Sequence, residues 1–338
     1  MALLDHHPNI ICLTPIKNEA WILERFLKCA SLWADHIIIA DQNSDDGSVE
    51  IANRFAKVTL VRNTSRDFNE AERQKILIEA ARRLPAPRLL IALDVDEFLT
   101  PNFLTSPEWQ TMLGAPRGTV ICFKWANIRP DLCHFWTTPY DNPWGFLDDD
   151  SPHAGSPIHS LRIPFPRHAP TIKLREIKVM HYQYADWERM RSKHRWYMVW
   201  ERLNMPRRSA ISVYRQYHHM FAVPKEELIP IPNWWFDEYA RQGIDMTSIY
   251  KDLPYRWDKD IIDLFIKHGT KTFSQDQIWD VDWQQIAVNY GYSSGEAKIF
   301  KDPRNFMQKM IHRWLQHTQP RSESLIVRAF DLILDKLI

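Results

Sequence analysis

The first 127 residues alternate short apolar runs with stretches of helical pattern. Apolar runs of strand length lie at 9–16, 36–40, 58–62, 89–94 and 119–125. Helical stretches between the first four of them lie at 19–33, 49–55 and 69–83. Strands that alternate with helices predict a mostly parallel central sheet with right-handed crossovers, and therefore the α/β class.

The regular alternation fades after about residue 127, where the chain becomes rich in Pro and Trp. Order returns with a predicted strand at 177–182 and a predicted helix at 186–203. From residue 224 onward the pattern is helical, with apolar stripes in 306–315 and 325–338. We expect three parts: an α/β half over residues 1–127, a second half of the same domain over 128–223, and a helical C-terminal extension over 224–338.

The composition is that of a folded globular protein, with 45% hydrophobic and 25% charged residues among 338. The net charge of +1 gives no reason to expect nucleic-acid binding. Charge is uneven, however, because residues 162–215 contain thirteen Lys and Arg against four Asp and Glu. Such a block could face phosphates, an acidic acceptor or a membrane surface, or form a solvated face.

The four cysteines lack the paired spacing of zinc or redox motifs, and no apolar run approaches the ~20 residues that span a bilayer. We therefore expect a cytoplasmic protein. The apolar stripes near the C-terminus are expected to pack on the body of the protein. Because Arg304, Lys309 and Arg313 lie beside the first stripe, peripheral contact with the inner face of a membrane is the alternative.

The most informative chemistry follows the apolar run 89–94, which ends in Asp94-Val95-Asp96-Glu97. Residues two apart in a strand face the same way, so Asp94 and Asp96 can converge on one cation or one polyhydroxyl group. The spacing suits a hard divalent metal that carries a diphosphate. Taken alone, such a pair also occurs as solvated or capping groups.

Two earlier strands also end in polar residues. The first leads through Pro15, Asn18 and Glu19 into a helix, and the second ends at Asp41, before a turn dense in capping residues. Carboxyl ends of parallel strands share one edge of the sheet, where ligands bind in such folds. We expect Asp41 to accept a hydrogen bond from an amide group of the nucleotide base, and Asp94 to accept hydrogen bonds from the ribose hydroxyls. We expect Asp96 to bind the metal.

The order of these motifs resembles the family 2 glycosyltransferases of the GT-A fold, in particular the branch of the lipopolysaccharide-core glucosyltransferases. The matching segments are 14–19, 40–48, 68–80 and 93–97. The resemblance implies a Rossmann-like sheet, a nucleoside diphosphate sugar as donor, Mn²⁺ or Mg²⁺, and transfer with inversion. The implied acceptor is a glycan or glycolipid, in the assembly of a surface polysaccharide such as capsule or lipopolysaccharide.

The resemblance also suggests residues beyond the three strand ends. His181, at the end of a later strand, is the candidate second metal ligand; a hydrogen-bonded core histidine is the alternative. Arg73 or Arg66 could contact the donor, although a solvated helix face explains Arg73 nearly as well. Lys193 or Arg195 could neutralise the departing diphosphate, and an exposed basic helix is an equal competitor.

The catalytic base is the weakest part of the pattern. Related enzymes often carry a Glu after a Val-His pair, and here Ser160 stands at that place in the segment 157–160. An inverting transfer needs a carboxylate or His within hydrogen-bond reach of the acceptor hydroxyl. The substitutes are His159, Asp149 and Asp150 together with the adjacent Asp148, although the Asp run could instead be a loop without catalytic function.

Two other functions are compatible with parts of this pattern. A haloacid-dehalogenase-type phosphohydrolase also uses Asp-x-Asp after a strand, but that family has Thr or Val where Phe98 stands here, and three strand units precede the pair. A nucleotide-sugar-binding protein of the same fold without turnover would explain the missing Glu. We expect the transferase.

Overall fold

The computed structural model describes residues 7–65, 67–251 and 253–336. The chain forms two compact units. The first contains the chain up to Ala185 and returns for Ile229–Tyr250; the second contains Asp186–Leu228 and the chain from Lys251 onward. These divisions do not coincide with the boundaries expected at residues 127 and 223. The three functional parts expected from the sequence remain predictions.

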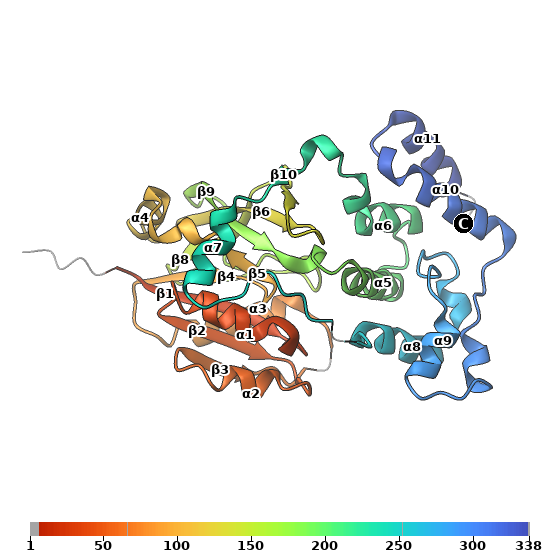
Figure 1. Ribbon diagram of the computed structural model, residues 1–338, viewed down its shortest axis with the longest axis horizontal. Helices are drawn as coiled ribbons and strands as arrows, with labels where there is room; N and C mark the ends of the chain where they lie inside the picture. Colours follow the sequence, from red (N-terminus) through yellow and green to blue (C-terminus); the bar gives the residue numbers. More distant parts are fainter. Residues whose placement is uncertain (1–6, 66, 252, 337–338) are drawn as a thin grey trace, which may run out of the picture. The chain divides into compact units, whose positions relative to one another are not determined.

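Four parallel strands form one half of the sheet in the first unit, in the order β3-β2-β1-β4 (Figure 1). They are β1 (Asn9–Ile16), β2 (His36–Asp41), β3 (Val58–Arg62) and β4 (Arg88–Ala92). Helices α1 (Ala20–Ala30), α2 (Ser48–Ala52) and α3 (Glu70–Ala81) connect them. The α/β class predicted from the alternation is confirmed.

Alternate residues of β1 face opposite helices. Cys12 belongs to the core that contains Phe26 of α1, whereas Leu13 belongs to the core that contains Leu77 of α3. Because both faces are covered, β1 and β4 are apolar almost without interruption. This burial produced the continuous runs visible in the sequence.

The other half of the sheet is mixed. It contains β5 (Glu97–Leu99), β6 (Val120–Ile128), β7 (His134–Trp136), β8 (Asn142–Leu147), β9 (Thr171–His181) and β10 (Ile229–Pro230). Strand β8 joins the halves by pairing antiparallel with both β4 and β6. Strand β9 runs parallel to β6 and antiparallel to β5, which places the end of β9 beside the residues that follow β4.

Two helices complete the first unit, α4 (Pro107–Leu113) and α7 (Asn233–Arg241). The hydroxyl of Tyr239 in α7 donates to the carbonyl of Leu99 at 2.7 Å, and Trp235 packs against Phe135 of β7. These buried aromatic contacts are why residues 229–250, expected within the helical extension, belong to the unit that holds the sheet.

The second unit is helical. Its helices are α5 (Trp187–Asn204), α6 (Ala210–Tyr217), α8 (Arg256–His268), α9 (Trp283–Asn289), α10 (Phe306–Thr318) and α11 (Leu325–Leu334). Phe265 of α8 lies at the centre of its core, in ring contact with Trp279, Trp283 and Phe300. Over the described part of the chain, no helix is both long and apolar enough to cross a bilayer.

Candidate functional site

The loops after β1 and β2 are tied together by side chains. Asn18 adopts a left-handed conformation (φ 55°) and donates its backbone N–H to Ser44 Oγ at 2.9 Å and its side-chain amide to Asp45 Oδ1 at 2.7 Å. Backbone N–H groups of Glu19 and Ala20 donate to Ser48 and Asp46, both at 2.9 Å. The capping residues of the turn before α2 therefore also bind the loop after β1 and the start of α1.

Asp41 lies at the carboxyl end of β2, against this interlocked turn. Its side chain is largely buried and accepts the backbone N–H of Ser44 at 3.2 Å. The next residue, Gln42, donates its amide to the carbonyls of Ser65 and Asp67, in the loop that leads to α3. Pro15 is buried in β1 opposite Ala40, one position before Asp41. Pro15, Asn18, Glu19 and Asp41 thus occupy the same sheet edge, as predicted from strand order.

Asp94, just beyond the end of β4, is bound to a residue that the sequence does not single out. Arg162 Nη2 donates to Asp94 Oδ2 at 2.7 Å, while the Asp94 backbone N–H donates to Glu97 Oε2 at 2.9 Å. The Asp94 side chain is 38% exposed. It can therefore still meet a ligand, but only as part of an ion pair.

Glu97 is fully buried beneath this ion pair. Its two oxygens accept from Arg162, and Oε1 also accepts the indole N–H of Trp125 at 2.8 Å. Burial raises the pKa of Glu97 to about 7, with Asp94 and Asp96 adding to the shift and Arg162 opposing it. Burial would lower the pKa of Arg162, but Asp94 and Glu97 outweigh it and raise that pKa, so the guanidinium stays charged.

Asp96 directly precedes β5, and His181 ends β9, the strand that pairs with β5. Glu97 pairs with His181 in the β5/β9 register, and the N–H of Tyr182 donates to the carbonyl of Asp96 at 2.8 Å. The Asp96 side chain is nearly buried, and its carboxylate makes no hydrogen bond or ion pair with any residue that the structure describes. A nearly buried carboxylate without such a partner is a natural ligand for a cation.

Contacts that hold His181 in place include those with Trp125, Asn127 and Tyr184. The imidazole ring stacks on Trp125, with centroids 4.7 Å apart and planes 12° from parallel. Nδ1 lies 3.0 Å from Asn127 Oδ1, and an amide oxygen can only accept, so the proton is assigned to Nδ1. That tautomer leaves the lone pair on Nε2, the nitrogen through which a metal would be bound. No three His, Cys, Asp or Glu side chains form a ready metal cluster within the described ranges.

Arg73 lies in the first turns of α3, at the same edge. Its guanidinium sits 4.8 Å from the ring centre of Phe68, and Nη2 is 4.0 Å from Glu70 Oε1. Its Nε is buried and has no hydrogen-bond partner among the residues described. Such a donor suits an anionic ligand. Arg66, the other donor contact predicted from sequence, lies outside the described residues.

The loop 157–160 packs on the start of α3. The N–H of Glu70 donates to the carbonyl of Pro157 at 2.9 Å, and the N–H of Ser160 donates to Glu70 Oε2 at 2.8 Å. His159 is exposed and left-handed, with φ 53°. The structure therefore brings His159 to the sheet edge that holds Asp41, and it adds Glu70, a carboxylate that the sequence reasoning missed.

Asp149 and Asp150 lie at the opposite edge, which removes them as candidates for the base. Asp148, at the end of β8, donates its N–H to the carbonyl of Arg88, the first residue of β4. Six residues of extended chain, about 20 Å, separate Arg88 from Asp94. Asp150 is paired with Arg88 and Arg117, so this acidic run anchors strand ends.

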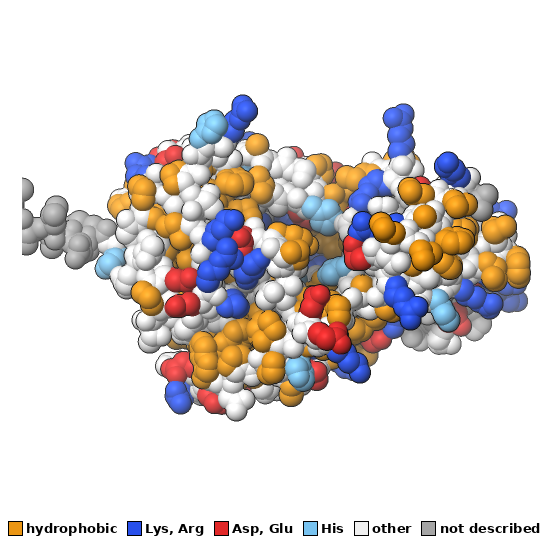
Figure 2. All heavy atoms as spheres, turned by 90° about the horizontal axis from the view of Figure 1, so that it is seen from above, with side chains coloured by type: hydrophobic (Ala, Val, Ile, Leu, Met, Phe, Trp, Pro, Cys, Tyr) orange, Lys and Arg blue, Asp and Glu red, His pale blue; other side chains and the backbone are white. Residues whose placement is uncertain are grey.

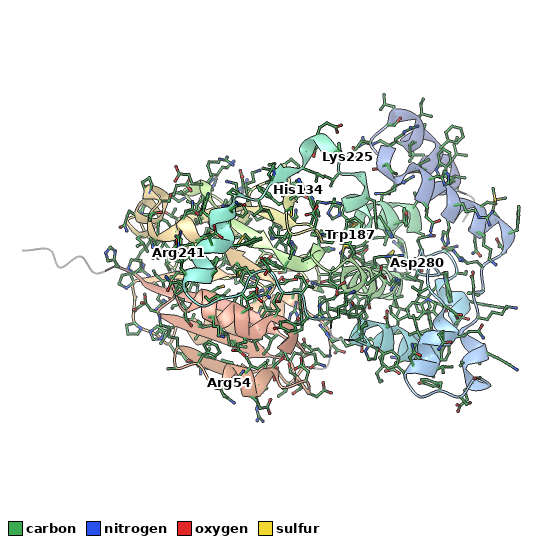
Figure 3. The ribbon with its side chains drawn as sticks, viewed as in Figure 1. Arg54, His134, Trp187, Lys225, Arg241 and Asp280 are labelled. Carbon is green, nitrogen blue, oxygen red and sulfur yellow. The ribbon has the colours of Figure 1, made fainter. Side chains whose placement is uncertain are left out.

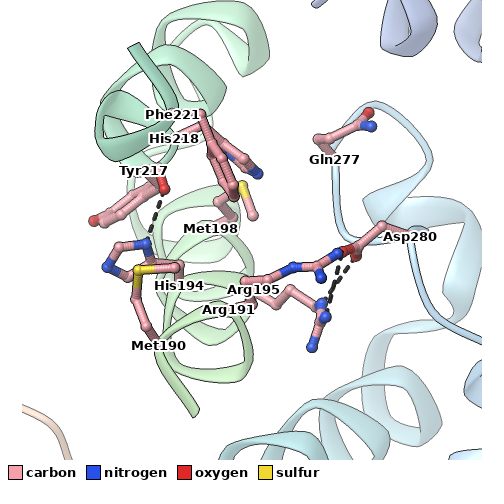
Figure 4. A pocket seen from close by; sticks show the side chains of 10 residues that line it. All are labelled: Met190, Arg191, His194, Arg195, Met198, Tyr217, His218, Phe221, Gln277 and Asp280. Carbon is pink, nitrogen blue, oxygen red and sulfur yellow. Dashed lines mark hydrogen bonds and ion pairs between the residues drawn. The ribbon is translucent and has the colours of Figure 1, made fainter. Parts of the chain in front are cut away.

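Arg195 also has a structural role, in the second unit. Its side chain is 5% exposed and donates through Nε to Asp280 Oδ1 at 2.9 Å, and Arg191 binds the same carboxylate (Figure 4). Asp280 precedes α9 and is labelled in Figure 3. These residues line a small pocket of about 10 Å³, together with Met190 and Phe221. The buried ion pair does not fit the predicted contact with a leaving diphosphate. Lys193, also on α5, keeps that role only as a prediction.

Four groups at the sheet edge around Asp94 were missed from the sequence: Arg162, Glu70, Trp125, and Glu97 as a buried partner of Arg162. Arg162 lay within the basic block, but nothing in its spacing pointed to Asp94. Glu97 follows Asp96 directly, and its burial is not visible in the motif.

One comparison with known proteins concerns the part of the first unit from β1 to the start of β6. Residues 12–122 match the sequence model of the family described as glycosyl transferase family 2. No curated protein matches the chain.

Similar solved structures include GalNAc-T7 with UDP, GalNAc and Mn²⁺ (17% identity, 37% of this chain, 24% of that chain, TM-score 0.29). Others are HddC from Yersinia pseudotuberculosis (10%, 51% and 92%, TM-score 0.30) and mannose-1-phosphate geranyltransferase from Thermus thermophilus (13%, 42% and 51%, TM-score 0.28). The chain spans about a quarter of the first of these proteins. Residues 12–122, which hold Asp41, Asp94 and Asp96, are thus similar in sequence to the family 2 glycosyl transferases.

Proposed function

We propose that this protein is a metal-dependent glycosyltransferase, which moves a sugar with inversion from a nucleoside diphosphate donor to a glycan or glycolipid acceptor. A surface polysaccharide is the proposed product. One observation carries the proposal: Asp96, nearly buried and with a carboxylate that has no partner among described residues, directly precedes the residue that pairs with His181, at the sheet edge that also holds Asp41 and Asp94.

Asp96 and His181 would hold the metal. Two protein ligands are few, but Mg²⁺ and Mn²⁺ sites commonly complete their shell with water and substrate phosphates. When bound, the metal would neutralise the diphosphate as it departs. The hydrogen bond between His181 and Asn127 supports this assignment, because it orients the imidazole before the ion arrives.

The donor would lie along the same edge. Asp41 would accept from the base, the Asp94–Arg162 pair would bind the ribose hydroxyls, and Arg73, with its unsatisfied Nε, would meet a phosphate oxygen. Among the bases predicted from sequence, His159 is the one that we retain. Glu70 would fix the loop that carries it, through the hydrogen bond to Ser160.

The test is thermal unfolding in the presence of Mn²⁺ and each member of a panel of nucleotide-sugars, followed by assays for released nucleoside diphosphate. A ligand at about one hundred times its Kd stabilises the folded state by about 2.7 kcal/mol. Asp96→Asn should remove the metal-dependent part of that stabilisation and the turnover. Asp149→Asn is the matched control, because that carboxylate lies at the opposite edge.

Three results would contradict the proposal. Stabilisation without any release of nucleoside diphosphate would favour a binding protein of the same fold. Release of phosphate from simple phosphoesters would favour a phosphohydrolase. Equal responses of Asp96→Asn and the wild-type protein would show that the metal is held elsewhere.

A further inference from the structure

Helices α10 and α11 of the second unit carry large apolar side chains that face solvent. Phe306 is 79% exposed in α10, and Leu325 is 81% exposed in α11. The other exposed apolar residues of the two helices are Met307, Met310, Ile326, Phe330, Leu332 and Ile333. We call these eight residues the α10/α11 face. Single exposed apolar residues are ordinary, but eight on two adjacent helices form a patch that calls for a partner.

The two helices present this face as one surface. The rings of Trp314 and Phe330 lie 5.3 Å apart, and the Trp314 indole donates to Asp331 at 3.0 Å. Arg215 of α6 binds the same aspartate. Ile311 and Leu315 on the other side of α10 are buried with Ile211 and Tyr214 of α6. The inner faces of the two helices are therefore already packed against other parts of the second unit. Figure 2 shows apolar side chains gathered near basic ones on the outer surface.

The charges around the α10/α11 face are mostly basic. Exposed basic side chains are Lys309, Arg313, Arg321, Arg328 and Lys336, of which Arg328 is paired with Glu323 and Lys309 lies 3.8 Å from Asp302. The acidic residues of the same segment are engaged: Asp331 by Arg215 and Trp314, Asp335 by the hydroxyl of Ser209, and Glu323 by Arg328. An apolar surface with an excess of basic side chains complements a lipid interface with anionic headgroups.

We propose that the α10/α11 face binds the surface of an anionic membrane, with its apolar side chains in the interfacial region and its Lys and Arg side chains at the headgroups. Helices of thirteen and ten residues are too short to span a bilayer, so they would lie in its plane. A second protein copy fits less well, because interface cores are depleted in charged residues, Lys included. The inference goes beyond the proposed transferase and does not depend on it.

Sedimentation of the full chain with vesicles tests this proposal. One vesicle preparation contains phosphatidylcholine alone, and the other contains phosphatidylcholine mixed with phosphatidylglycerol. We expect binding to the mixed vesicles that weakens as salt is raised. Phe306→Glu/Leu325→Glu should reduce binding at least about tenfold, since two deep apolar contacts are lost. Ile266→Glu is the matched control, because Ile266 is also exposed but lies in α8.

A second variant separates charge from apolar contact. Lys309→Gln/Arg313→Gln should lower the preference for the mixed vesicles while the circular dichroism of the protein stays unchanged. Wild-type protein that binds neither preparation would overturn the proposal, as would equal binding by Phe306→Glu/Leu325→Glu. A wild-type dimer that this double variant makes monomeric, with no vesicle binding by either, would assign the face to self-association. Nucleotide-sugar binding, measured by thermal unfolding, should be the same in all variants. Failure of the membrane proposal can therefore be distinguished from failure of the proposed transferase function.

Discussion

The indole of Trp125 stacks on the imidazole of His181 and, through its N–H, binds the buried carboxylate of Glu97. Trp125 therefore links the Asp94–Arg162–Glu97 cluster to the proposed metal ligand. The stacked ring limits rotation of His181, and the hydrogen bond to Glu97 limits rotation of Trp125. A change at Trp125 should act on the metal site without removing any of its ligands.

Trp125→Leu should weaken metal binding about 10- to 100-fold, the range found when groups that orient a ligand are lost. Mn²⁺ titration followed by thermal unfolding measures this. Trp125→Phe keeps a ring on His181 but loses the bond to Glu97, and should give a smaller loss. If both variants bound Mn²⁺ as tightly as the wild-type protein, the orienting role would be wrong.

Arg162→Met should destabilise the protein by about 3 to 5 kcal/mol, because it leaves Glu97 and Asp94 without their cation. The effect should depend on pH. The folded-state pKa of Glu97 is already raised above its ordinary value to about 7, so ionisation of Glu97 destabilises the fold and stability falls as pH rises through that range. Without Arg162 the pKa of Glu97 should rise further, so the fall should continue to higher pH and the difference between the two proteins should grow above pH 7. Urea unfolding of both proteins below and above pH 7 measures it, and a pH-independent difference would contradict the prediction.

His159→Gln should lower kcat about 10² to 10⁴-fold if this histidine takes the acceptor proton. In this variant the rise of rate with pH that reports deprotonation of the base, which is one limb of the pH–rate profile, should also disappear. Glu70→Gln should cost less and keep that limb, because Glu70 positions the loop through Ser160. The opposite result, a lost limb only in Glu70→Gln, would make Glu70 the base.

Asp280→Asn tests the structural role given to Arg195. Arg195 and Arg191 outweigh the burial of Asp280 and lower its pKa to about 2. A lowered folded-state pKa stabilises the protein above the ordinary Asp value, and this contribution is lost as pH falls toward 2. At neutral pH the variant should therefore be less stable by about 2 kcal/mol or more, and the difference should shrink in acid. Chemical unfolding at several pH values provides the measurement; full stability of the variant at neutral pH would contradict it.

Much of the parallel half could be predicted from the sequence. Strands expected at 9–16 and 58–62 have those bounds. Burial on both faces gave the first its nearly unbroken apolar run, whereas the second is a partly exposed strand at the end of the sheet, recognisable by its β-branched and apolar residues. Strands β7 and β8 were not predicted, since β7 has only three residues and β8 contains Pro and Gly, which are unusual in strands. Strand β9 begins at Thr171, earlier than the expected 177, because its first half is largely exposed and shows no apolar run.

The strand-end aspartates could be placed at one edge because parallel strands have a common direction. Contacts that depend on the antiparallel half could not be predicted. Arg162 reaches Asp94 across 68 positions of sequence, and no periodicity encodes that approach. The same reason misplaced Asp149 and Asp150: only the antiparallel run of β8 beside β4 carries them to the far edge.

The tied loops after β1 and β2 have a consequence for molecular recognition. Hydrogen bonds to Ser44, Ser48 and Asp46 fix the backbone N–H groups from Asn18 to Ala20, and a fourth, to Asp45, fixes the Asn18 side chain. A nucleotide arriving at Asp41 would meet a surface whose shape was set during folding, so little chain entropy would be lost on association. The protein would then discriminate between nucleotide bases by the fit of each base to this rigid surface. Loss of one of these hydrogen bonds, for example in Ser48→Ala, should reduce the difference in affinity between nucleotides more than it reduces the affinity for any one of them.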